Sequence, residues 1–379
     1  MHERIYLSLA QMGGSEQAFI KEAFDTNWVV PLGPNVDAFE KDLEAFIGEE
    51  RHIVALASGT AAIHLGLLQL GVGPGDEVVC QSFTFAASAN PVAYLGAKPV
   101  YVDSEADTWN MSPRFLEEAI LDRKAKTGKY PKAIVPVHLY GMPARMDEIG
   151  AVAAKYGIPI MEDAAEAIGS EYKGRKCGAF GEFGALSFNG NKMITTSGGG
   201  ALICRTGVEA RRTMFYATQA RENRPYYYHE HIGYNYRMSN ICAGIGRGQM
   251  LVLAGHIARR RAIHALYTGL LEDIKGVEVM QNPGAEYDSN FWLTCMTVDP
   301  AVCGMTADDI RLRLEAENIE SRLLWRPMHM QPVYADCPFY GDGTAERIFN
   351  KGLCLPSGSS LTDEQIRAVA DVIKNSLAL

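Results

Sequence analysis

Short apolar segments alternate with helical patterns between residues 53 and 204, and this alternation restricts the fold more than any other feature of the sequence. Short, continuous apolar runs are typical of strands buried on both faces. Strands are predicted at residues 52–58, 76–82, 98–103, 132–139, 158–164 and 184–188, with helices at residues 59–71, 88–96 and 145–157. This order predicts an α/β fold with a mostly parallel sheet covered on both faces. Ligands of such sheets bind beyond the carboxyl ends of the strands.

The pattern changes after about residue 250. A long helical pattern covers residues 250–274, weaker strand signals lie near residues 291–298, and further helices are predicted at residues 306–318 and 362–377. A chain of 379 residues is long enough for two domains. We expect a large domain over residues 1–250 and a smaller α+β domain over residues 251–379.

Charge and apolar run lengths exclude several classes of protein. The formal net charge of −9 argues against nucleic-acid binding. The run Arg259–Arg261 lies in a helical pattern and is predicted to be a solvated helix face, with phosphate binding as the minor alternative. No apolar run reaches the roughly 18 residues of a membrane span, and the first residues lack the pattern of a signal peptide.

The eight cysteines are scattered and form no C-x-x-C pair. A disulfide framework or a metal site would show closer spacing. We therefore expect free thiols in a reducing cytoplasm and no metal, although a catalytic cysteine is not excluded by spacing. The eight cysteines are Cys80, Cys177, Cys204, Cys242, Cys295, Cys303, Cys337 and Cys354.

Lys192 lies in the segment SFNGNKMITTSGGG, residues 187–200, which does not satisfy the P-loop pattern. A P-loop has Gly directly before the lysine and Ser or Thr directly after it. Here Asn191 separates Gly190 from Lys192, and Met193 follows. NTP hydrolysis is therefore not predicted. A lysine in a turn is ordinarily exposed to solvent, so only its neighbours can give Lys192 a function.

Three features follow the predicted strands and together suit an aldehyde cofactor. Ser58-Gly59-Thr60 opens a helix, where free N–H groups can hold a phosphate. Glu162 and Asp163 end a strand, where a carboxylate can keep a pyridine nitrogen protonated. Lys192 offers the amine for a Schiff base. Each feature alone has an ordinary alternative: a simple helix cap, an acid facing water, or a surface lysine.

A ring that stacks on the pyridine is also required. Phe83 and Phe85 in QSFTFAAS are the candidates, and both could instead be core residues.

Seven segments carry a resemblance that covers nearly the whole chain. They are ASGTAAIHLGL, QSFTFAASANPVAYLGAKPVYVD, VHLYGMPARMDEI, EDAAEAIGSEYKG, SFNGNKMITTSGGGAL, GYNYRMSN and MHMQPVY. In this order they resemble the DegT/DnrJ/EryC1/StrS family of nucleotide-sugar aminotransferases. The resemblance implies a pyridoxal phosphate (PLP) enzyme of fold type I, the fold of aspartate aminotransferase, with pyridoxamine phosphate as the amino form of the cofactor.

The resemblance also implies roles for individual residues. Lys192 matches the Schiff-base lysine, Asp163 the acid on the pyridinium nitrogen and Phe85 the stacking ring. Ser58, Gly59, Thr60 and Ser187 match the phosphate cradle, and Glu166 stands where many relatives carry His or Gln near the cofactor's hydroxyl. Asn235 matches a residue that reaches the neighbouring subunit's cofactor, which implies a homodimer with shared active sites. Arg237 and His329 are candidates for contacting the nucleotide sugar, and both have structural alternatives.

The implied reaction transfers an amino group from L-glutamate to a keto sugar. The segments EDAAEA, NGNKMITTSGGG, ATQARE and RPMHMQPVY look most like the enzymes that aminate C4 of UDP-4-keto-6-deoxy-N-acetylglucosamine on the route to bacillosamine-type glycans. Many relatives read T-G-E-G-G after the lysine segment, whereas this chain reads TSGG at residues 196–199, which indicates a subgroup with a different substrate.

Three alternatives to this reaction remain. The acceptor could be a GDP-4-keto-6-deoxymannose or a 3-keto UDP-sugar, or the chain could be a regulator that binds PLP without turnover. The related dehydratases carry His at the lysine position, so Lys192 argues against dehydration.

Overall fold

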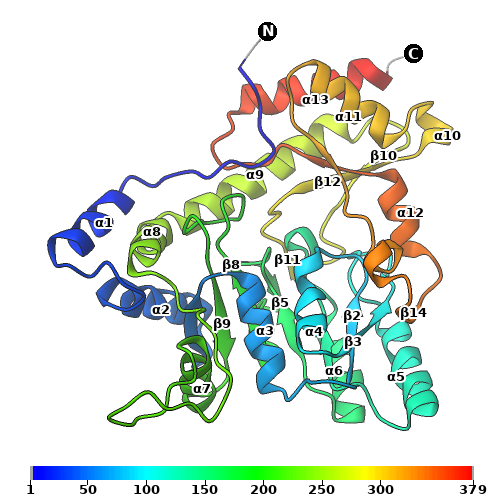
Figure 1. Ribbon diagram of the computed structural model, residues 1–379. Coiled ribbons are helices and arrows are strands. Elements are labelled where there is room, and N and C mark those ends of the chain that lie inside the picture. Colours follow the sequence, from blue (N-terminus) through cyan, green and yellow to red (C-terminus); the bar gives the residue numbers. More distant parts are fainter. Residues whose placement is uncertain (1–2, 378–379) are drawn as a thin grey trace.

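The computed structural model describes residues 3–377 and contains one large central sheet (Figure 1). In spatial order its strands are β14 (Phe339–Tyr340), β3 (Lys98–Val102), β2 (Glu77–Gln81), β4 (Ala133–Val135), β5 (Met161–Asp163), β8 (Phe183–Ser187), β9 (Gly200–Cys204) and β1 (His52–Leu56). Two four-stranded halves meet between β4 and β5 through the parallel bridges Ile134–Ile160 and Val137–Asp163. All six strands predicted in this region are present.

Strand β9 is the exception to the parallel arrangement. It runs antiparallel to both β8 and β1, whereas β2 with β3, β2 with β4, β5 with β8 and β14 with β3 are parallel pairs. Two neighbouring parallel strands are normally joined by a long crossover connection that contains a helix. No helix lies between β8 and β9. The chain therefore turns back through residues 188–199, and this turn contains Lys192. The mostly parallel sheet is confirmed, but β9 had not been predicted.

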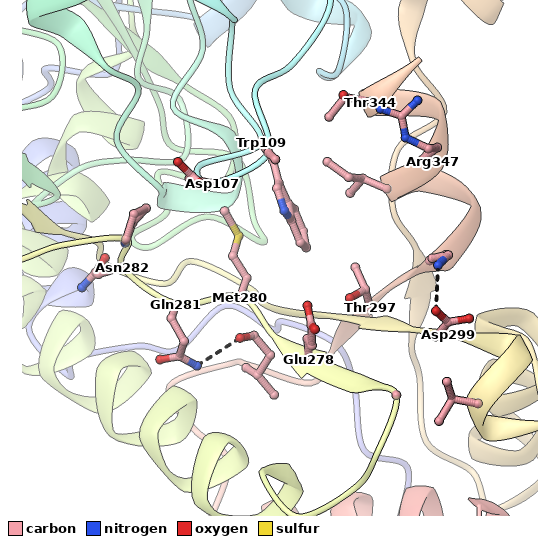
Figure 2. Close-up of a pocket in the computed structure, with 17 residues that line it drawn as sticks. Asp107, Trp109, Glu278, Met280, Gln281, Asn282, Thr297, Asp299, Thr344 and Arg347 are labelled. Carbon is pink, nitrogen blue, oxygen red and sulfur yellow. Dashed lines mark hydrogen bonds and ion pairs between the residues drawn. The ribbon is translucent and has the colours of Figure 1, made fainter. Parts of the chain in front are cut away.

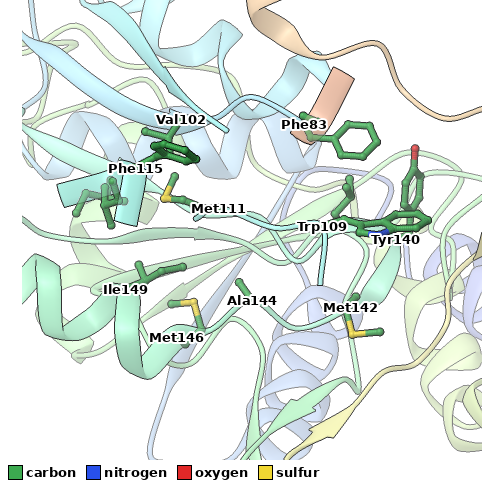
Figure 3. Close-up of a cluster of buried hydrophobic side chains, with 14 of the residues drawn as sticks. Phe83, Val102, Trp109, Met111, Phe115, Tyr140, Met142, Ala144, Met146 and Ile149 are labelled. Atoms are coloured by element: carbon green, nitrogen blue, oxygen red, sulfur yellow. The ribbon is translucent and has the colours of Figure 1, made fainter. Parts of the chain in front are cut away.

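Helices bury both faces of the sheet. Val79 of β2 lies in a core cluster with side chains of α5 (Pro113–Thr127) and α6 (Met146–Tyr156), part of which Figure 3 shows. Its neighbours Val78 and Cys80 lie in another cluster, with α3 (Gly59–Gln69). Successive strand residues point to opposite faces, so an uninterrupted apolar strand is the expected sequence for this position.

Most of the chain after residue 250 forms a second layer, above the large sheet in Figure 1. Its antiparallel sheet has the order β10 (Val277–Val279), β12 (Thr294–Val298), β15 (Gly352–Leu355) and β13 (Arg322–Leu323). Helices α9 (Leu253–Leu271), α11 (Ala307–Ala316) and α13 (Asp363–Leu377) share a core with it. The remaining helices and strands are α1 (Glu16–Asp25), α2 (Pro34–Ile47), α4 (Asn90–Tyr94), α7 (Gly207–Ala217), α8 (Asn240–Met250), α10 (Pro300–Cys303), α12 (Thr344–Lys351), β6 (Glu171–Tyr172), β7 (Arg175–Lys176) and β11 (Tyr287–Asp288).

Three segments cross the division predicted at residue 250. Ile5, near the start of the chain, bridges to Ile319 and belongs to the core of the second layer. Conversely, β14 extends the large sheet by pairing with β3, and β11 pairs with β6. The division into residues 1–250 and 251–379 stays a prediction, and any such boundary must place these three segments with the other part of the chain.

The prediction for Arg259–Arg261 was wrong at its middle residue. Arg259 and Arg261 form surface ion pairs with Asp363 and Asp288. Arg260, in contrast, is 1% exposed. The two flanking arginines lie toward solvent, while the side chain of Arg260 is turned into the protein, where main-chain and hydroxyl oxygens bind it.

No single helix in residues 3–377 is long and apolar enough to cross a membrane. Helices α8 and α9 pass such a test only when they are joined, and they are bent by 61° at the break between them.

The start of β9 tolerates only glycine, because it passes against the backbone of the β1–α3 connection. A Cβ atom on Gly200 would lie 2.3 Å from the main-chain nitrogen of Gly59 and 2.4 Å from the carbonyl carbon of Ser58. Backbone atoms cannot move aside as a flexible side chain can. We therefore expect Gly200→Ala to lower the free energy of unfolding by about 3 kcal/mol.

Urea denaturation measures this change, with Gly198→Ala as the matched control. A Cβ on Gly198 meets no atom within 4 Å. Equal unfolding midpoints for the two variants would contradict the close approach.

Candidate active site

Eight of the predicted site residues line one pocket of about 300 Å³. They lie at or just beyond the ends of β1, β5 and β8, and in the segment after β2. The carboxyl ends of these parallel strands meet at one edge of the sheet, where ligands bind. The eight residues are Ser58, Gly59, Thr60, Phe85, Asp163, Glu166, Ser187 and Lys192.

The Lys192 side chain is held inside this pocket and is only 12% exposed. Its Nζ atom donates a hydrogen bond of 3.0 Å to Oε1 of Glu166. The same atom lies 4.1 Å from the ring centroid of Trp292, a cation–π distance. The alternative of a surface lysine in a turn is therefore excluded.

Glu166 is buried beside Lys192, and its second oxygen accepts a hydrogen bond of 2.8 Å from the main-chain N–H of Tyr140. Burial raises the pKa of the Glu166 carboxyl to about 7, against the opposing effects of the Lys192 ammonium and the Tyr140 N–H. Glu166 can therefore hold or release a proton near neutral pH, next to the lysine amine. Tyr140, whose N–H binds Glu166, adopts a left-handed backbone with φ of 54°, which is strained for a bulky residue.

A pH-dependent stability difference between the wild type and Glu166→Gln follows from this shift. The folded pKa lies above the ordinary value of 4.5, so folding favours the protonated carboxyl. The stabilising effect of this proton is complete below about pH 4.5 and is lost as the pH rises through about 7. Relative to Glu166→Gln, we expect the wild-type free energy of unfolding to fall by on the order of 3 kcal/mol over this range.

Denaturation of the cofactor-free proteins at several pH values measures the difference. Parallel curves of stability against pH for the two proteins would contradict the raised pKa.

Asp163 faces the pocket with a fixed orientation. Its Oδ2 atom accepts a hydrogen bond of 2.5 Å from the Ser88 hydroxyl, and its Oδ1 atom accepts one of 3.1 Å from the N–H of Ala165. The Ser88 hydroxyl lies 2.7 Å from that of Thr84, which extends the network. An ionised carboxylate has about four acceptor sites, so a cationic group in the pocket can still bind it.

The neighbouring Glu162 has a different role. It is fully buried and lies 2.9 Å from Nε2 of His138, and it also accepts a hydrogen bond of 2.8 Å from the N–H of Gly178. Glu162 does not line the pocket. Because side chains alternate along a strand, only one of the two acids can face the site, and that acid is Asp163.

The β1–α3 connection fits a phosphate. Ser58 caps α3 by accepting a hydrogen bond of 3.0 Å from the N–H of Ala61. The first N–H groups of a helix lack partners within the helix, and the positive end of its dipole attracts an anion. A Cβ on Gly59 would lie 3.0 Å from Cβ of Ser187, so glycine allows Ser187 to approach. The cap and the phosphate seat are therefore compatible.

The structure distinguishes between the two phenylalanines. Phe83 is fully buried in the core cluster that Figure 3 shows. Phe85 is 56% exposed and lines the pocket, with its ring centroid 5.4 Å from that of Trp325. Phe85 is thus the ring available for stacking.

Three predicted residues lie outside this pocket. Arg237 pairs with Glu40 and donates a hydrogen bond of 3.0 Å to the carbonyl of Ala55. His329 lies between the hydroxyl of Ser82 and the carboxylate of Glu346, at 2.6 and 3.0 Å. Their contact with the sugar stays a prediction. Asn235 is exposed, and its contact with a partner subunit also stays a prediction.

Three further aromatic residues near the site, Tyr140, Trp292 and Trp325, had not been predicted. The ring of Tyr140 stacks on Trp292 at 6.4 Å and lies 5.0 Å from Trp325. Trp325 directly precedes the quoted segment RPMHMQPVY, which is the only sequence signal for it. Tyr140 lies inside the quoted segment VHLYGMPARMDEI, but no spacing pattern marks it or Trp292 as part of the site, because both are brought to Lys192 from distant parts of the chain.

A larger cavity of about 900 Å³ contains none of the predicted site residues (Figure 2). It is lined by parts of β10, β12 and α12 and by Trp109. Both of its basic residues are already paired, Lys351 with Asp299 at 3.1 Å and Arg347 with Asp342 at 3.3 Å. Cavity size alone would therefore select the wrong place for the chemistry.

Within residues 3–377 no group of three or more His, Cys, Asp or Glu side chains could hold a metal ion. All eight cysteines are free, and six of them are buried.

The geometry of the pocket agrees with the comparison to known proteins. The sequence pattern of the DegT/DnrJ/EryC1/StrS aminotransferase family matches residues 10–374. The chain belongs to this family. It is 48% identical to EpsN of Bacillus subtilis strain 168, whose name describes a pyridoxal phosphate-dependent aminotransferase, over 98% of this chain and 96% of that protein.

Two further relatives cover nearly the whole chain. GDP-perosamine synthase of Caulobacter vibrioides is 35% identical over 97% of this chain and 96% of that protein. A solved family member from Brucella abortus has a TM-score of 0.89 and 31% identity, and each chain covers 96% of the other. The fold is therefore that of the PLP-dependent transferases of fold type I, and pyridoxal phosphate is the cofactor.

The pocket residues fit this cofactor. The amine of Lys192, the fixed carboxylate of Asp163 and the unpaired N–H groups at the start of α3 match its aldehyde, pyridine nitrogen and phosphate. Family membership thus identifies the cofactor, and the structure shows the pocket groups that suit it.

Proposed function

We propose that this aminotransferase moves an amino group from L-glutamate to C4 of UDP-2-acetamido-2,6-dideoxy-4-keto-hexose, in the synthesis of bacillosamine-type glycans. The observation that carries the amino transfer is the largely enclosed Lys192 amine, which shares a pocket with Asp163 and the start of α3. The UDP-sugar is supported by the local resemblance of EDAAEA and NGNKMITTSGGG. The cytoplasmic location stays a prediction.

Lys192 would bind the cofactor covalently and, when displaced by the amino donor, act as the base of the reaction. Its Nζ atom would take a proton from Cα of glutamate and later give a proton to C4 of the sugar. The bound cofactor supplies an aldehyde that carries the amino group and a ring that stabilises negative charge at the carbon losing its proton. Glu166, 3.0 Å from Nζ, can accept a proton when Lys192 becomes neutral.

The other residues would bind and orient. Asp163 would hold the positive charge of the pyridine nitrogen, and Ser58, Gly59, Thr60 and Ser187 would bind the phosphate through N–H and hydroxyl groups. Phe85 would cover the ring, and Trp325 beside it would exclude water from the reacting atoms.

A homodimer is part of this proposal. Asn235 is exposed and lies outside the pocket, so a phosphate contact from Asn235 would have to be made in a partner's site.

A second candidate acceptor has its own support. A relative with 35% identity is a GDP-perosamine synthase, which favours a GDP-linked 4-keto-6-deoxy sugar as the alternative. A 3-keto UDP-sugar would require only a different orientation of the sugar. A non-catalytic regulator is disfavoured because Lys192, Asp163 and Ser187 are all present in the pocket.

Visible absorbance of the PLP-loaded protein tests the class and the acceptor separately. L-Glutamate should remove the cofactor's visible band, and the UDP-4-keto-6-deoxy-N-acetyl sugar should restore it. Restoration by the GDP-4-keto sugar alone would transfer the proposal to that acceptor. A band that does not respond to glutamate would contradict an aminotransferase and indicate the regulator.

A further inference from the structure

The loop that carries Lys192 is held by side chains from other parts of the chain. Residues 188–199 contain neither a helix nor a strand. Three successive carbonyl oxygens, those of Asn191, Lys192 and Met193, instead have side-chain partners. The carbonyl of Met193 is buried, those of Asn191 and Lys192 have partly buried contacts with Trp292 and Arg260, and main-chain oxygens that are removed from water without partners are costly. The side chains that bind them therefore help to determine where the loop lies, and with it the start of the Lys192 side chain.

The partners come from three separate segments. The carbonyl of Asn191 accepts hydrogen bonds of 2.8 Å from the Ser8 hydroxyl and from the indole N–H of Trp292. The carbonyl of Lys192 accepts one of 3.5 Å from Nη2 of Arg260. The carbonyl of Met193 lies 3.3 Å from Nδ1 of His256, which is also on α9.

Arg260 is the centre of this arrangement. Besides the carbonyl of Lys192, its guanidinium donates to the carbonyl of Trp292 and, at 2.9 Å, to the hydroxyl of Ser8. None of the described carboxylates forms an ion pair with it, and its Nε atom has no partner. Burial lowers its pKa to about 9.

A buried charge without a counter-ion is unfavourable, and an apolar side chain of similar volume would avoid that cost. The fixed fork of five N–H donors is what an apolar residue lacks. It joins the N-terminal segment, the Lys192 loop and the segment containing Trp292. The ring of Trp292 in turn lies 4.1 Å from the Lys192 amine. One guanidinium thus fixes both the main chain of the lysine and the ring beside its amine.

We propose that Arg260 is a positioning residue that holds the Lys192 loop and Trp292 where the lysine amine reaches the cofactor. The inference rests on the role proposed above for Lys192. It assigns to the buried member of the arginine run an effect on the reaction without contact with substrate or cofactor.

Arg260→Met tests this role, with Arg259→Met on the same helix as the matched control. A misplacement of about 1 Å can reduce a rate about 10²-fold. For Arg260→Met we expect kcat to fall about 10²-fold while KM for L-glutamate changes less than about threefold. The circular dichroism of the cofactor's visible band should also weaken, because it reports the cofactor's orientation. Arg259→Met should match the wild type in all three measurements.

Two further variants keep the test decisive if Arg260→Met does not fold. Arg260→Lys retains the charge and part of the hydrogen bonding, and should recover about tenfold of the lost kcat. Ser8→Ala removes one acceptor of the guanidinium and one donor to the loop, and should lower kcat about threefold to tenfold. Wild-type kcat and visible circular dichroism in Arg260→Met, or in Ser8→Ala where Arg260→Met is unfolded, would overturn the proposal.

Borohydride reduction of the PLP-loaded wild type, followed by peptide mass analysis, separates this inference from the proposed function. Attachment to Lys192 in the wild type, with less attachment in Arg260→Met, supports both. Attachment to another lysine would refute the role of Lys192 and with it the positioning role of Arg260. Attachment to Lys192 with equal yield, kcat and dichroism in both proteins would refute the role of Arg260 alone.

Discussion

Lys192→Ala is expected to abolish transamination while the fold remains intact. The variant loses the covalent attachment of the cofactor and the base that moves the proton. Since general acid–base catalysis alone is worth about 10²- to 10⁴-fold, we expect kcat to fall at least about 10⁴-fold. Absence of the glutamate-sensitive visible band, measured together with the rate, identifies the lost step.

The stability of Lys192→Ala should change little at neutral pH. Removal of the ammonium leaves Glu166 buried beside an empty space, but the pKa of this carboxyl is already raised to about 7, so the group can become neutral. We expect a change of about 1 kcal/mol in the free energy of unfolding.

Lys192→Arg is the matched control for the ion pair. It keeps a cation next to Glu166 but cannot form the covalent link, and it should be as inactive as Lys192→Ala. Activity of either variant within tenfold of the wild type would refute the proposed mechanism.

Asp163→Asn should give the second-largest loss of activity. Asparagine has the same shape and can still accept the hydrogen bond from Ser88 through its amide oxygen, but its amide nitrogen cannot accept the one from the N–H of Ala165. It also carries no charge to hold a protonated pyridine nitrogen. Fixed electrostatic groups of this kind are typically worth about 10²- to 10³-fold in kcat. We expect a loss of about 10³-fold in kcat, with about 1 kcal/mol lost from the free energy of unfolding. Steady-state kinetics and thermal unfolding measure the two effects.

Glu162→Gln provides the opposite result and serves as the control. This neighbouring acid is buried with His138 and lies outside the pocket. Disrupting a buried pair by removing one charged partner typically costs about 3 to 5 kcal/mol. Glu162→Gln should therefore lose stability by about 3 kcal/mol while kcat below its melting temperature stays within about threefold. If the two variants exchanged these effects, the assignment of Asp163 to the cofactor would be wrong.

Much of the candidate site could be predicted from the sequence, because its residues follow strands in the order of the chain. The apolar runs that end near Ala57, Ala164 and Phe188 predict strands of one parallel sheet, and parallel strands end at a common edge. The sequence therefore predicts that Ser58, Asp163 and Lys192 lie close together, and they line one pocket. The cofactor followed from matching these three groups to its aldehyde, nitrogen and phosphate.

Other features depended on contacts between distant segments. The choice between Phe83 and Phe85, and between Glu162 and Asp163, depends on which face of the chain each side chain occupies. Helical periodicity could not show that Arg260 is buried, because its partners Ser8, Lys192 and Trp292 lie far from it in the sequence. The strand β9 was not predicted because the prediction relied on the alternation of strands and helices. The chain turns back through residues 188–199 into an antiparallel strand, with no helix in between.

The sequence by itself determined the sheet, the edge at which ligands bind and the reactive groups at that edge, since these follow from local periodicity and chain order. Only the tertiary structure decided what surrounds the Lys192 amine. Its contacts with Glu166 and Trp292 join residues 26 and 100 positions away, and the pKa of Glu166 is raised by burial. Burial and long-range hydrogen bonds arise only when the chain is packed, so the electrostatics of the site belong to the fold rather than to any segment of the sequence.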